Sequence, residues 1–241
     1  GKAHIGFGNS SSTVDGIAGR APFKKKVTNV CQIANIYPQY FQVVAVSSAN
    51  VKSFADLKGK SVVTQPKGNT GELLTDLVLK LNGMDYKALS KVNFQASYTD
   101  AVSMVKDGHA QVFTLGTTAP ASSVMDLASA RDITLVPVDD KTMNSLKQEN
   151  AGYVKLTIKA GTYPKQTQDV PVIGYSTHII AACDLPEQTV YTMVKTMAQN
   201  VESMSAVNKA IGGLTPKDMA IDIGVPMHKG ALKFYKEAGA L

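Results

Sequence analysis

Residues 61–83 constrain the fold of this chain more than any other stretch. A short apolar run over residues 61–64 is followed by a glycine-rich turn over residues 65–71. Beyond the turn, apolar side chains recur at spacings of three and four, at Leu73, Leu74, Leu77, Val78 and Leu81. The run predicts a buried strand, and the spacing predicts a helix with one apolar face. The stretch therefore predicts a strand, a turn and a helix in direct succession.

The turn has the features of an anion-binding site. Asn69 or Thr70 can cap the first turn of the predicted helix, and Asn82 with Gly83 is expected to end it. The first N–H groups of a helix lack partners within the helix and carry partial positive charge, which favours bound anions. Lys67 adds a full positive charge beside them. We therefore predict that this turn binds a carboxylate.

Strand and helix patterns alternate along the rest of the chain. Further strands are predicted over residues 2–9, 27–36, 41–46, 110–115, 133–138, 153–158 and 170–183. Helices are predicted over residues 53–57, 98–106, 121–130, 141–150, 185–201 and 231–238. Loops are expected over residues 9–13, 15–23 and 161–169, with a corner at 37–40. This alternation predicts an α/β protein with mainly parallel sheets.

Three polar turns are expected at the carboxyl ends of the strands, over residues 9–13, 65–71 and 116–119. Ligands of open α/β sheets bind at these ends. The turns offer hydroxyls, amides, bare backbone and a single lysine. Such groups suit ligand binding better than bond breaking.

Motifs for catalysis or for metal binding are absent from the sequence. It contains no G-x-S-x-G elbow, no H-E-x-x-H and no C-x-x-C, and its four histidines lie at scattered positions. The turn over residues 68–71 also lacks the Gly-Lys-Ser/Thr that closes a P-loop. We therefore expect no metal, no cofactor and no enzymatic activity.

The net charge of +6 is spread along the chain. Its one dense run is three lysines at positions 24–26, and no basic stripe is interleaved with aromatic residues, as nucleic-acid binding would require. The lysines are expected to be solvated surface residues. The positive excess suits a protein with an anionic ligand, and no nucleic-acid partner is expected.

Cys31 and Cys183 are too few and too far apart for a metal site or a disulfide framework. Both lie in apolar runs, so the sequence leaves open two buried thiols or a single bridge. No apolar run approaches the roughly 20 residues needed to cross a bilayer, and no signal-peptide pattern begins the sequence. The protein is therefore expected to be cytoplasmic, or the sequence begins after a segment that was removed.

Several stretches together resemble the solute receptors of TRAP (tripartite ATP-independent periplasmic) transporters, specifically the TAXI family. The turn over residues 65–71 is one of them. The others, in sequence order, are residues 53–60, 107–113, 116–120, 130–137, 160–164, 184–187 and 225–230, with Phe234 and Tyr235. They cover nearly the whole chain, which makes the resemblance specific.

The resemblance implies a periplasmic-binding-protein-like (type II) fold of two α/β lobes with a hinge and an inter-lobe cleft. The first lobe would comprise residues 1–46 and 176–241 and the second residues 47–175, with hinge crossings near 42–50 and 170–178. The implied function is capture of a small organic anion or amino acid, such as the dicarboxylates glutamate and 2-oxoglutarate. Delivery would be to a TRAP-type membrane permease, from the periplasm, by a receptor that is a monomer when full length.

Carried onto this sequence, the resemblance also implies ligand-binding residues. The first lobe would contribute Asn9, Ser10 and Ser11. The second would contribute Lys67, Gly68, Asn69, Thr70, Thr117, Thr118 and Ala119. Near the hinge crossings, Tyr37 and Tyr175 are further candidates, with hinge packing as the alternative role.

The opening of the family pattern has no counterpart here. Family members begin with a strand, a glycine-rich loop with paired tyrosines and a helix, before the segment that resembles residues 2–9. This opening quarter and the export signal are missing, so we expect a truncated, cleaved or rearranged first lobe with exposed sheet edge and apolar surface. Two other functions stay open: an enzyme (a transferase or isomerase) on a similar scaffold, using Lys67 and Glu72, and a ligand-sensing surface antigen.

Overall fold

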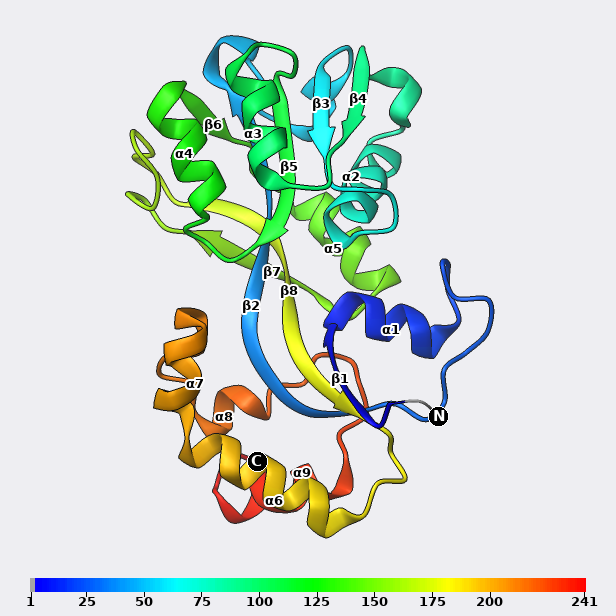
Figure 1. The fold of residues 1–241 in the computed structure, drawn as a ribbon. Coiled ribbons are helices and arrows are strands. Elements are labelled where there is room, and N and C mark those ends of the chain that lie inside the picture. Colours follow the sequence, from blue (N-terminus) through cyan, green and yellow to red (C-terminus); the bar gives the residue numbers. More distant parts are fainter. Residues whose placement is uncertain (1–2) are drawn as a thin grey trace. The chain divides into compact units, whose positions relative to one another are not determined.

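The computed structural model describes residues 3–241. Gly1 and Lys2 lie outside the described residues, and Lys2 is the first residue of the predicted strand over 2–9. The chain forms two compact units. Unit 1 comprises the chain up to Pro38, the short segment Glu149–Tyr153, and Tyr175–Leu241. Unit 2 comprises Gln39–Gln148 and Val154–Gly174. Strands β2 (Cys31–Val46) and β8 (Val170–Ala181) each run from one unit into the other (Figure 1).

Unit 2 is built on a mixed sheet. Strand β3 (Ser61–Thr64) pairs in parallel with β4 (Lys91–Phe94) and with β5 (Val112–Thr117). Strand β2 pairs antiparallel with β5 and with β6 (Ile133–Leu135), and β1 pairs antiparallel with β8 in unit 1. The prediction of mainly parallel sheets was therefore wrong, because β2 runs against its neighbour β5.

Helices accompany the sheet of unit 2. They are α2 (Thr70–Leu81), α3 (Tyr98–Lys106), α4 (Ser122–Ala130) and α5 (Asp140–Glu149), with short 3₁₀ turns at Ser47–Ala49, Phe54–Leu57 and Tyr86–Ala88. Central to the core are Val63, Phe113, Leu115, Val124 and Leu127, each fully buried. The predicted succession of strand, turn and helix over residues 61–83 is confirmed. Leu73, however, points outward and is 36% exposed, so the apolar face of α2 is narrower than predicted.

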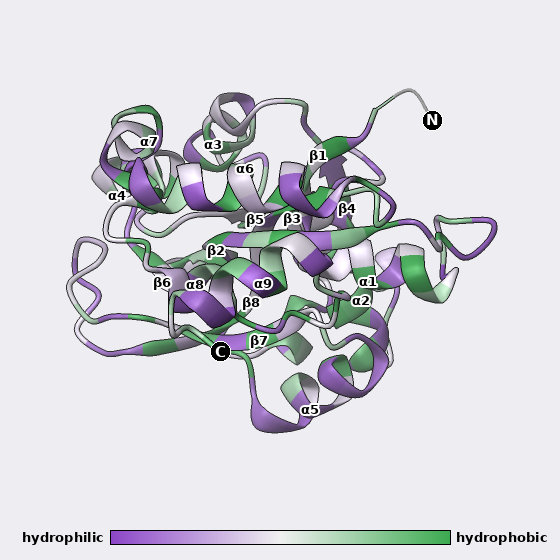
Figure 2. Cartoon of the chain, turned by 90° about the horizontal axis from the view of Figure 1, so that it is seen from below, coloured by the Kyte–Doolittle hydropathy of each residue, from purple (hydrophilic) through white to green (hydrophobic). Residues whose placement is uncertain are grey.

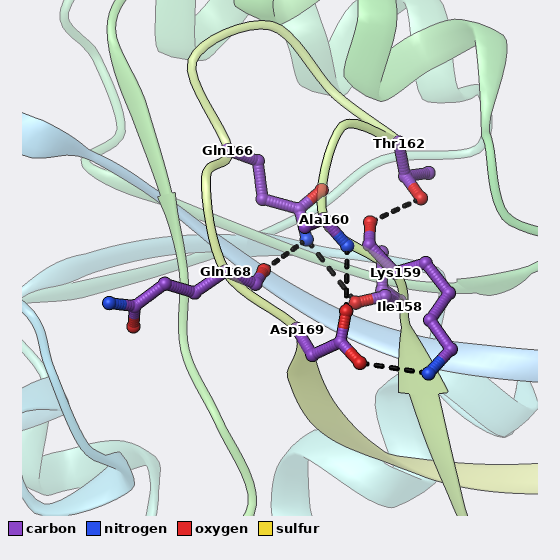
Figure 3. Close-up of polar contacts among 7 residues, drawn as sticks. All are labelled: Ile158, Lys159, Ala160, Thr162, Gln166, Gln168 and Asp169. Atoms are coloured by element: carbon purple, nitrogen blue, oxygen red, sulfur yellow. Dashed lines mark hydrogen bonds and ion pairs between the residues drawn. The ribbon is translucent and has the colours of Figure 1, made fainter.

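The connector between β7 (Tyr153–Ile158) and β8 is turn-rich, as predicted. Figure 3 shows how it is closed: Lys159 Nζ lies 2.8 Å from a carboxylate oxygen of Asp169, and the N–H of Ala160 donates to the other at 2.9 Å. The Gln166 amide donates to the carbonyl oxygens of Ile158 and Gln168, at 3.2 and 2.8 Å. These contacts connect the end of β7 to the residues just before β8.

Unit 1 contains strand β1 (Ile5–Asn9), paired with β8, and helix α1 (Ser10–Ala18). Its later helices are α6 (Glu187–Gln199), α7 (Val201–Val207), α8 (Pro216–Met219) and α9 (Lys229–Glu237), with a 3₁₀ turn at Lys209–Ile211. Hydrophilic and hydrophobic residues alternate along α6 in Figure 2, as expected for an amphipathic helix. Its apolar face shares a core with Ile33, Met219 and Tyr235, and the Tyr235 hydroxyl donates to the carbonyl oxygen of Ile33 at 2.7 Å.

Two local predictions in unit 1 were wrong. The loops expected over residues 9–13 and 15–23 are largely helix α1, which ends at Gly19 in a left-handed conformation (φ 71°). The sequence of α1 has weak helix propensity, and its polar residues are instead stabilised by tertiary hydrogen bonds. The corner expected at residues 37–40 is absent, because Pro38 lies within the continuous strand β2, whose extended backbone suits the fixed φ of proline.

The two cysteines form a disulfide bridge. Cys31 begins β2 and Cys183 follows β8, 152 residues later, so the bridge lies within unit 1. Of the two alternatives that the sequence left open, the single bridge is the one observed. In the described part of the chain, no helix is both long and apolar enough to span a membrane.

Candidate functional site

The turn over residues 65–71 connects β3 to α2, and three of its backbone N–H groups are already hydrogen-bonded within the chain. The N–H of Gly71 donates to Gln65 Oε1 at 3.0 Å, and that of Gly68 donates to Glu72 Oε2 at 3.0 Å. The N–H of Asn69 donates to the Pro66 carbonyl oxygen at 3.1 Å. A ligand at this turn would therefore compete with the turn's own acceptors for backbone donors.

Asn69, one of the two predicted caps of α2, does not cap the helix with its side chain. Asn69 occupies the N-cap position with extended backbone, but its side chain makes no capping hydrogen bond. The acceptor for the first turn is Gln65, whose longer side chain reaches forward to Gly71. The Asn69 carboxamide therefore stays at an exposed position of the turn.

Two side chains connect this turn to the carboxyl end of β5. The Gln65 amide donates to the Tyr98 hydroxyl at 3.1 Å, and that hydroxyl donates to the Gly116 carbonyl oxygen at 3.0 Å. A Cβ built on Gly71 would lie 3.2 Å from the backbone nitrogen of Gly116, so the two backbones approach closely. The predicted turns over 65–71 and 116–119 are thus neighbours. Neither Gln65 nor Tyr98 was predicted from the sequence as a site residue.

The segment over residues 117–119, at the end of β5, is also held by Gln42 and Tyr163. Gln42 Nε2 donates to the Thr118 carbonyl oxygen at 3.3 Å, and Gln42 Oε1 accepts from the Tyr163 hydroxyl at 2.6 Å. The same hydroxyl accepts the N–H of Ala121 at 2.9 Å. Burial raises the pKa of the Tyr163 phenol, so it stays a neutral donor. This framework holds Thr117, Thr118 and Ala119 at half-buried positions.

Lys67 is the charged group of the turn. Its Nζ lies 5.3 Å from the centre of the Phe94 ring, and within residues 3–241 it makes no ion pair. The Phe94 ring packs edge-on against Tyr86, with 5.8 Å between ring centres. Burial, followed by its hydrogen bond to Glu72, raises the pKa of Tyr86. The lysine is therefore held over an aromatic face, with its ammonium group exposed to ligands.

The predicted residues of unit 1 are engaged in internal contacts. Ser10 is fully buried; its hydroxyl donates to the Gly152 carbonyl oxygen at 2.7 Å and accepts the N–H of Ser176 at 2.9 Å. Ser11 is 2% exposed, and its carbonyl oxygen accepts from the Asn150 amide at 2.9 Å. A ligand-binding role for either serine stays a prediction.

The remaining candidates of unit 1 lie at different places. Asn9 is the half-buried N-cap residue of α1. Tyr37 is half-buried on β2, and Tyr175 is 1% exposed on β8. Each tyrosine lies next to the point where its strand passes from one unit to the other. Their positions fit both of the roles considered for them.

The carboxylate at these turns, that of Glu72, is hydrogen-bonded within the chain. Both oxygens of Glu72 accept hydrogen bonds, from the Gly68 N–H and from the Tyr86 hydroxyl at 2.8 Å, so this carboxylate is engaged in holding the turn. Among residues 3–241, no three His, Cys, Asp or Glu side chains are grouped to hold a metal ion. The groups at hand are an ammonium group, hydroxyls and an amide, which bind acidic groups.

Polar turns at strand ends are the places where open α/β sheets commonly bind ligands. The chain belongs to the NMT1-like family, whose sequence profile matches residues 1–239.

Three solved structures are similar to this chain. The periplasmic aliphatic sulphonate binding protein SsuA from Escherichia coli has 11% identity and a TM-score of 0.46, over 98% of this chain and 66% of that one. The alkanesulfonate-binding protein SsuA from Xanthomonas axonopodis pv. citri has 13% identity and a TM-score of 0.44, over 97% and 65%. A putative L-cystine ABC transporter protein from Listeria monocytogenes has 16% identity and a TM-score of 0.45, over 77% and 64%. Each match covers less than two thirds of the solved chain's own length.

Proposed function

We propose that the chain is the ligand-binding part of an extracytoplasmic solute-binding protein. It captures a small organic anion or amino acid, of the glutamate or 2-oxoglutarate class, and delivers it unchanged to a TRAP-type membrane permease. The observation that carries the proposal is the junction of the Lys67 turn with the end of β5 through Gln65 and Tyr98. This junction supports the proposal because the turn with the exposed Lys67 lies beside the segment with the half-buried Thr117 and Thr118, and the Glu72 carboxylate is hydrogen-bonded to Tyr86.

The disulfide supports the extracytoplasmic location. Bridges such as Cys31–Cys183 persist in oxidising compartments and are rare in the reducing cytosol. We therefore propose the periplasm as the site of action. Of the strands that pass between the units, β2 and β8 carry the proposed hinge crossings, at Pro38–Gln39 and Gly174–Tyr175. The first lies a few residues before the predicted range 42–50.

The proposal is tested by identifying the solute. Protein purified under native conditions is analysed by mass spectrometry for a co-purified molecule. Ligand-free protein is then screened by thermal shift against organic acids and amino acids, since a ligand that binds only the folded state raises its melting temperature. A dicarboxylate or acidic amino acid is expected to give the largest upshift. No upshift across the panel, for full-length protein, would contradict the function.

A matched pair of lysine variants locates the binding group. Lys67→Met is expected to weaken binding of the identified acid about tenfold, or ~1.4 kcal/mol. Lys58→Met is the control, because Lys58 is an exposed lysine of the same unit outside the turn. Equal affinities of the two variants would rule out Lys67 as the binding group. Conversion of the bound solute to a product would favour an enzyme instead.

A further inference from the structure

A buried carboxylate lies at the proposed ligand-binding turn. Glu72, in the first turn of α2, is 6% exposed. Its Oε2 accepts the N–H of Gly68 at 3.0 Å, and its Oε1 accepts the Tyr86 hydroxyl at 2.8 Å. Both oxygens are therefore held by donors of the chain, one of which belongs to the turn itself.

The Glu72 carboxylate lies at the N-terminus of α2, where a bound anion would be stabilised most. Glycine-rich turns before a helix bind phosphate groups in many proteins, because backbone N–H groups and the positive end of the helix dipole face the anion. Here the Gly68 N–H donates to the Glu72 carboxylate, and the Gly71 N–H donates to Gln65 Oε1 at 3.0 Å. Two of the backbone N–H donors that a phosphate would use are thus already hydrogen-bonded to side chains of the protein.

The charges that border the turn nearly cancel. Lys67 contributes one positive charge, held over the Phe94 ring, and Glu72 contributes one negative charge. Tyr86 connects them, since its ring packs against Phe94 and its hydroxyl donates to Glu72. A ligand with one negative charge can pair with Lys67. A second negative charge would find no further cation in the turn and would be repelled by Glu72.

We propose that Glu72 restricts this turn to acid groups with a single negative charge, such as a carboxylate or sulfonate, and disfavours doubly charged groups such as phosphate. The proposal rests on the proposed function, because it concerns the acid group of the same solute. Tyr86 and Phe94 are positioning residues: they orient Glu72 and Lys67 without contacting the ligand.

The test is an NMR titration of the turn with small anions. Methanesulfonate carries one charge at every pH used, whereas inorganic phosphate carries mainly one at pH 5.5 and mainly two at pH 8.5. The amide shifts of Lys67, Asn69 and Thr70 report binding at the turn. In the natural protein, doubly charged phosphate is expected to bind no more tightly than methanesulfonate. In Glu72→Gln, phosphate at pH 8.5 is expected to gain about fivefold relative to methanesulfonate.

Two further variants separate charge from structure. Tyr86→Phe removes the phenol donor but keeps the Glu72 carboxylate. Asp76→Asn removes a carboxylate from the same helix, where it pairs with Lys80 at 2.6 Å instead of facing the turn's amides. Both are expected to leave the ratio of the two anion affinities within about twofold of the natural protein. A similar rise in phosphate preference in all three variants would overturn the proposal.

The natural protein alone can also decide the proposal if Glu72→Gln does not fold. Tighter binding of phosphate at pH 8.5 than of methanesulfonate would overturn it, and so would the absence of any anion-induced shift at the turn. The solute panel tests the proposed function separately. If a panel ligand binds the protein but leaves the amide chemical shifts of the turn unchanged, the proposed solute-binding function stands and the role proposed for Glu72 is wrong.

Discussion

The hydroxyl of Ser10 donates a hydrogen bond to the carbonyl oxygen of Gly152, 2.7 Å away and 142 residues later in the chain. A Cβ built on Gly152 would lie 2.6 Å from the carbonyl carbon of Ser10 and from the nitrogen of Ser11. Only a glycine fits against this backbone. The contact fastens the short segment Glu149–Tyr153 to the first turn of α1 within unit 1.

Gly152→Ala is therefore expected to destabilise unit 1. The new methyl group meets backbone atoms of α1, which cannot move aside as a side chain can, so we expect a loss of about 2–4 kcal/mol in the free energy of unfolding. Urea denaturation measures it. Gly239→Ala is the control, because its Cβ would meet nothing within 4 Å and its left-handed backbone (φ 65°) costs only about 1 kcal/mol. Equal losses would show that the close approach is not the cause.

A second prediction concerns the pH dependence of stability. His178 is fully buried, its Nε2 lies 2.8 Å from the Thr13 hydroxyl, and burial lowers its pKa from 6.5 to about 4. Between these values the unfolded chain binds a proton that the folded chain does not, so stability falls as the pH falls from 6.5 towards 4. At pH 5 the loss is about 2 kcal/mol relative to pH 7.5.

The measurement is urea unfolding at pH 7.5 and at pH 5, for the natural protein and for His178→Gln. The variant loses the imidazole contact at both pH values, so only the difference between the two pH values is compared. We expect that difference to shrink by most of the 2 kcal/mol estimated above. An unchanged pH dependence in the variant would show that other groups cause the acid sensitivity.

The sequence predicted elements whose signal is local. The period of α2 and the short helical turn over residues 53–57 depend on residues close together in the chain. Helix α1 was missed because its stabilising partners are distant. Ser10 bonds to Gly152, and Thr13 to His178, neither of which a local pattern reveals. The antiparallel pairing of β2 with β5 was also missed, because it depends on contacts between residues far apart in the chain.

For the candidate site, the sequence indicated the turns but not the contacts that shape them. Lys67 and its neighbours were predicted from the glycine-rich pattern. Gln65 and Tyr98 join two turns through hydrogen bonds across 33 residues, which only the packing of α3 beside the sheet brings about. Glu72 was visible as an acidic residue of the first helical turn, but its burial was not, since carboxylates there are commonly exposed.

The disulfide gives a third prediction. Cys31 and Cys183 close a loop of 152 residues, so the chain-entropy model assigns the bridge about 5 kcal/mol, and measured losses are commonly 2–5 kcal/mol. Cys31→Ser with Cys183→Ser is expected to lower the urea midpoint by a corresponding amount. Reductant should reproduce this in the natural protein and leave the double variant unchanged. A reductant effect of equal size on the double variant would contradict it.

A pair of glycine substitutions tests how the ligand-binding turn is held. A Cβ on Gly71 would lie 2.1 Å from Gln65 Oε1, so Gly71→Ala must displace that side chain and break its bonds to the Gly71 N–H and to Tyr98. The gain in helix propensity, about 1 kcal/mol, offsets part of this loss. We therefore expect a small change in global stability with a large change at the turn.

Gly68→Ala is the matched variant, because its Cβ would meet nothing within 4 Å but its φ of 88° is strained for alanine, at about 1–2 kcal/mol. Gly68→Ala should thus lower global stability more than Gly71→Ala, yet keep the Gln65 side-chain amide resonances and slow hydrogen exchange at Gly71. Gly71→Ala should shift those resonances and speed exchange across the turn. If Gly71→Ala left the Gln65 resonances in place, the turn would be held by its backbone alone, and the link through Gln65 to Tyr98 and the end of β5 would not support the binding site.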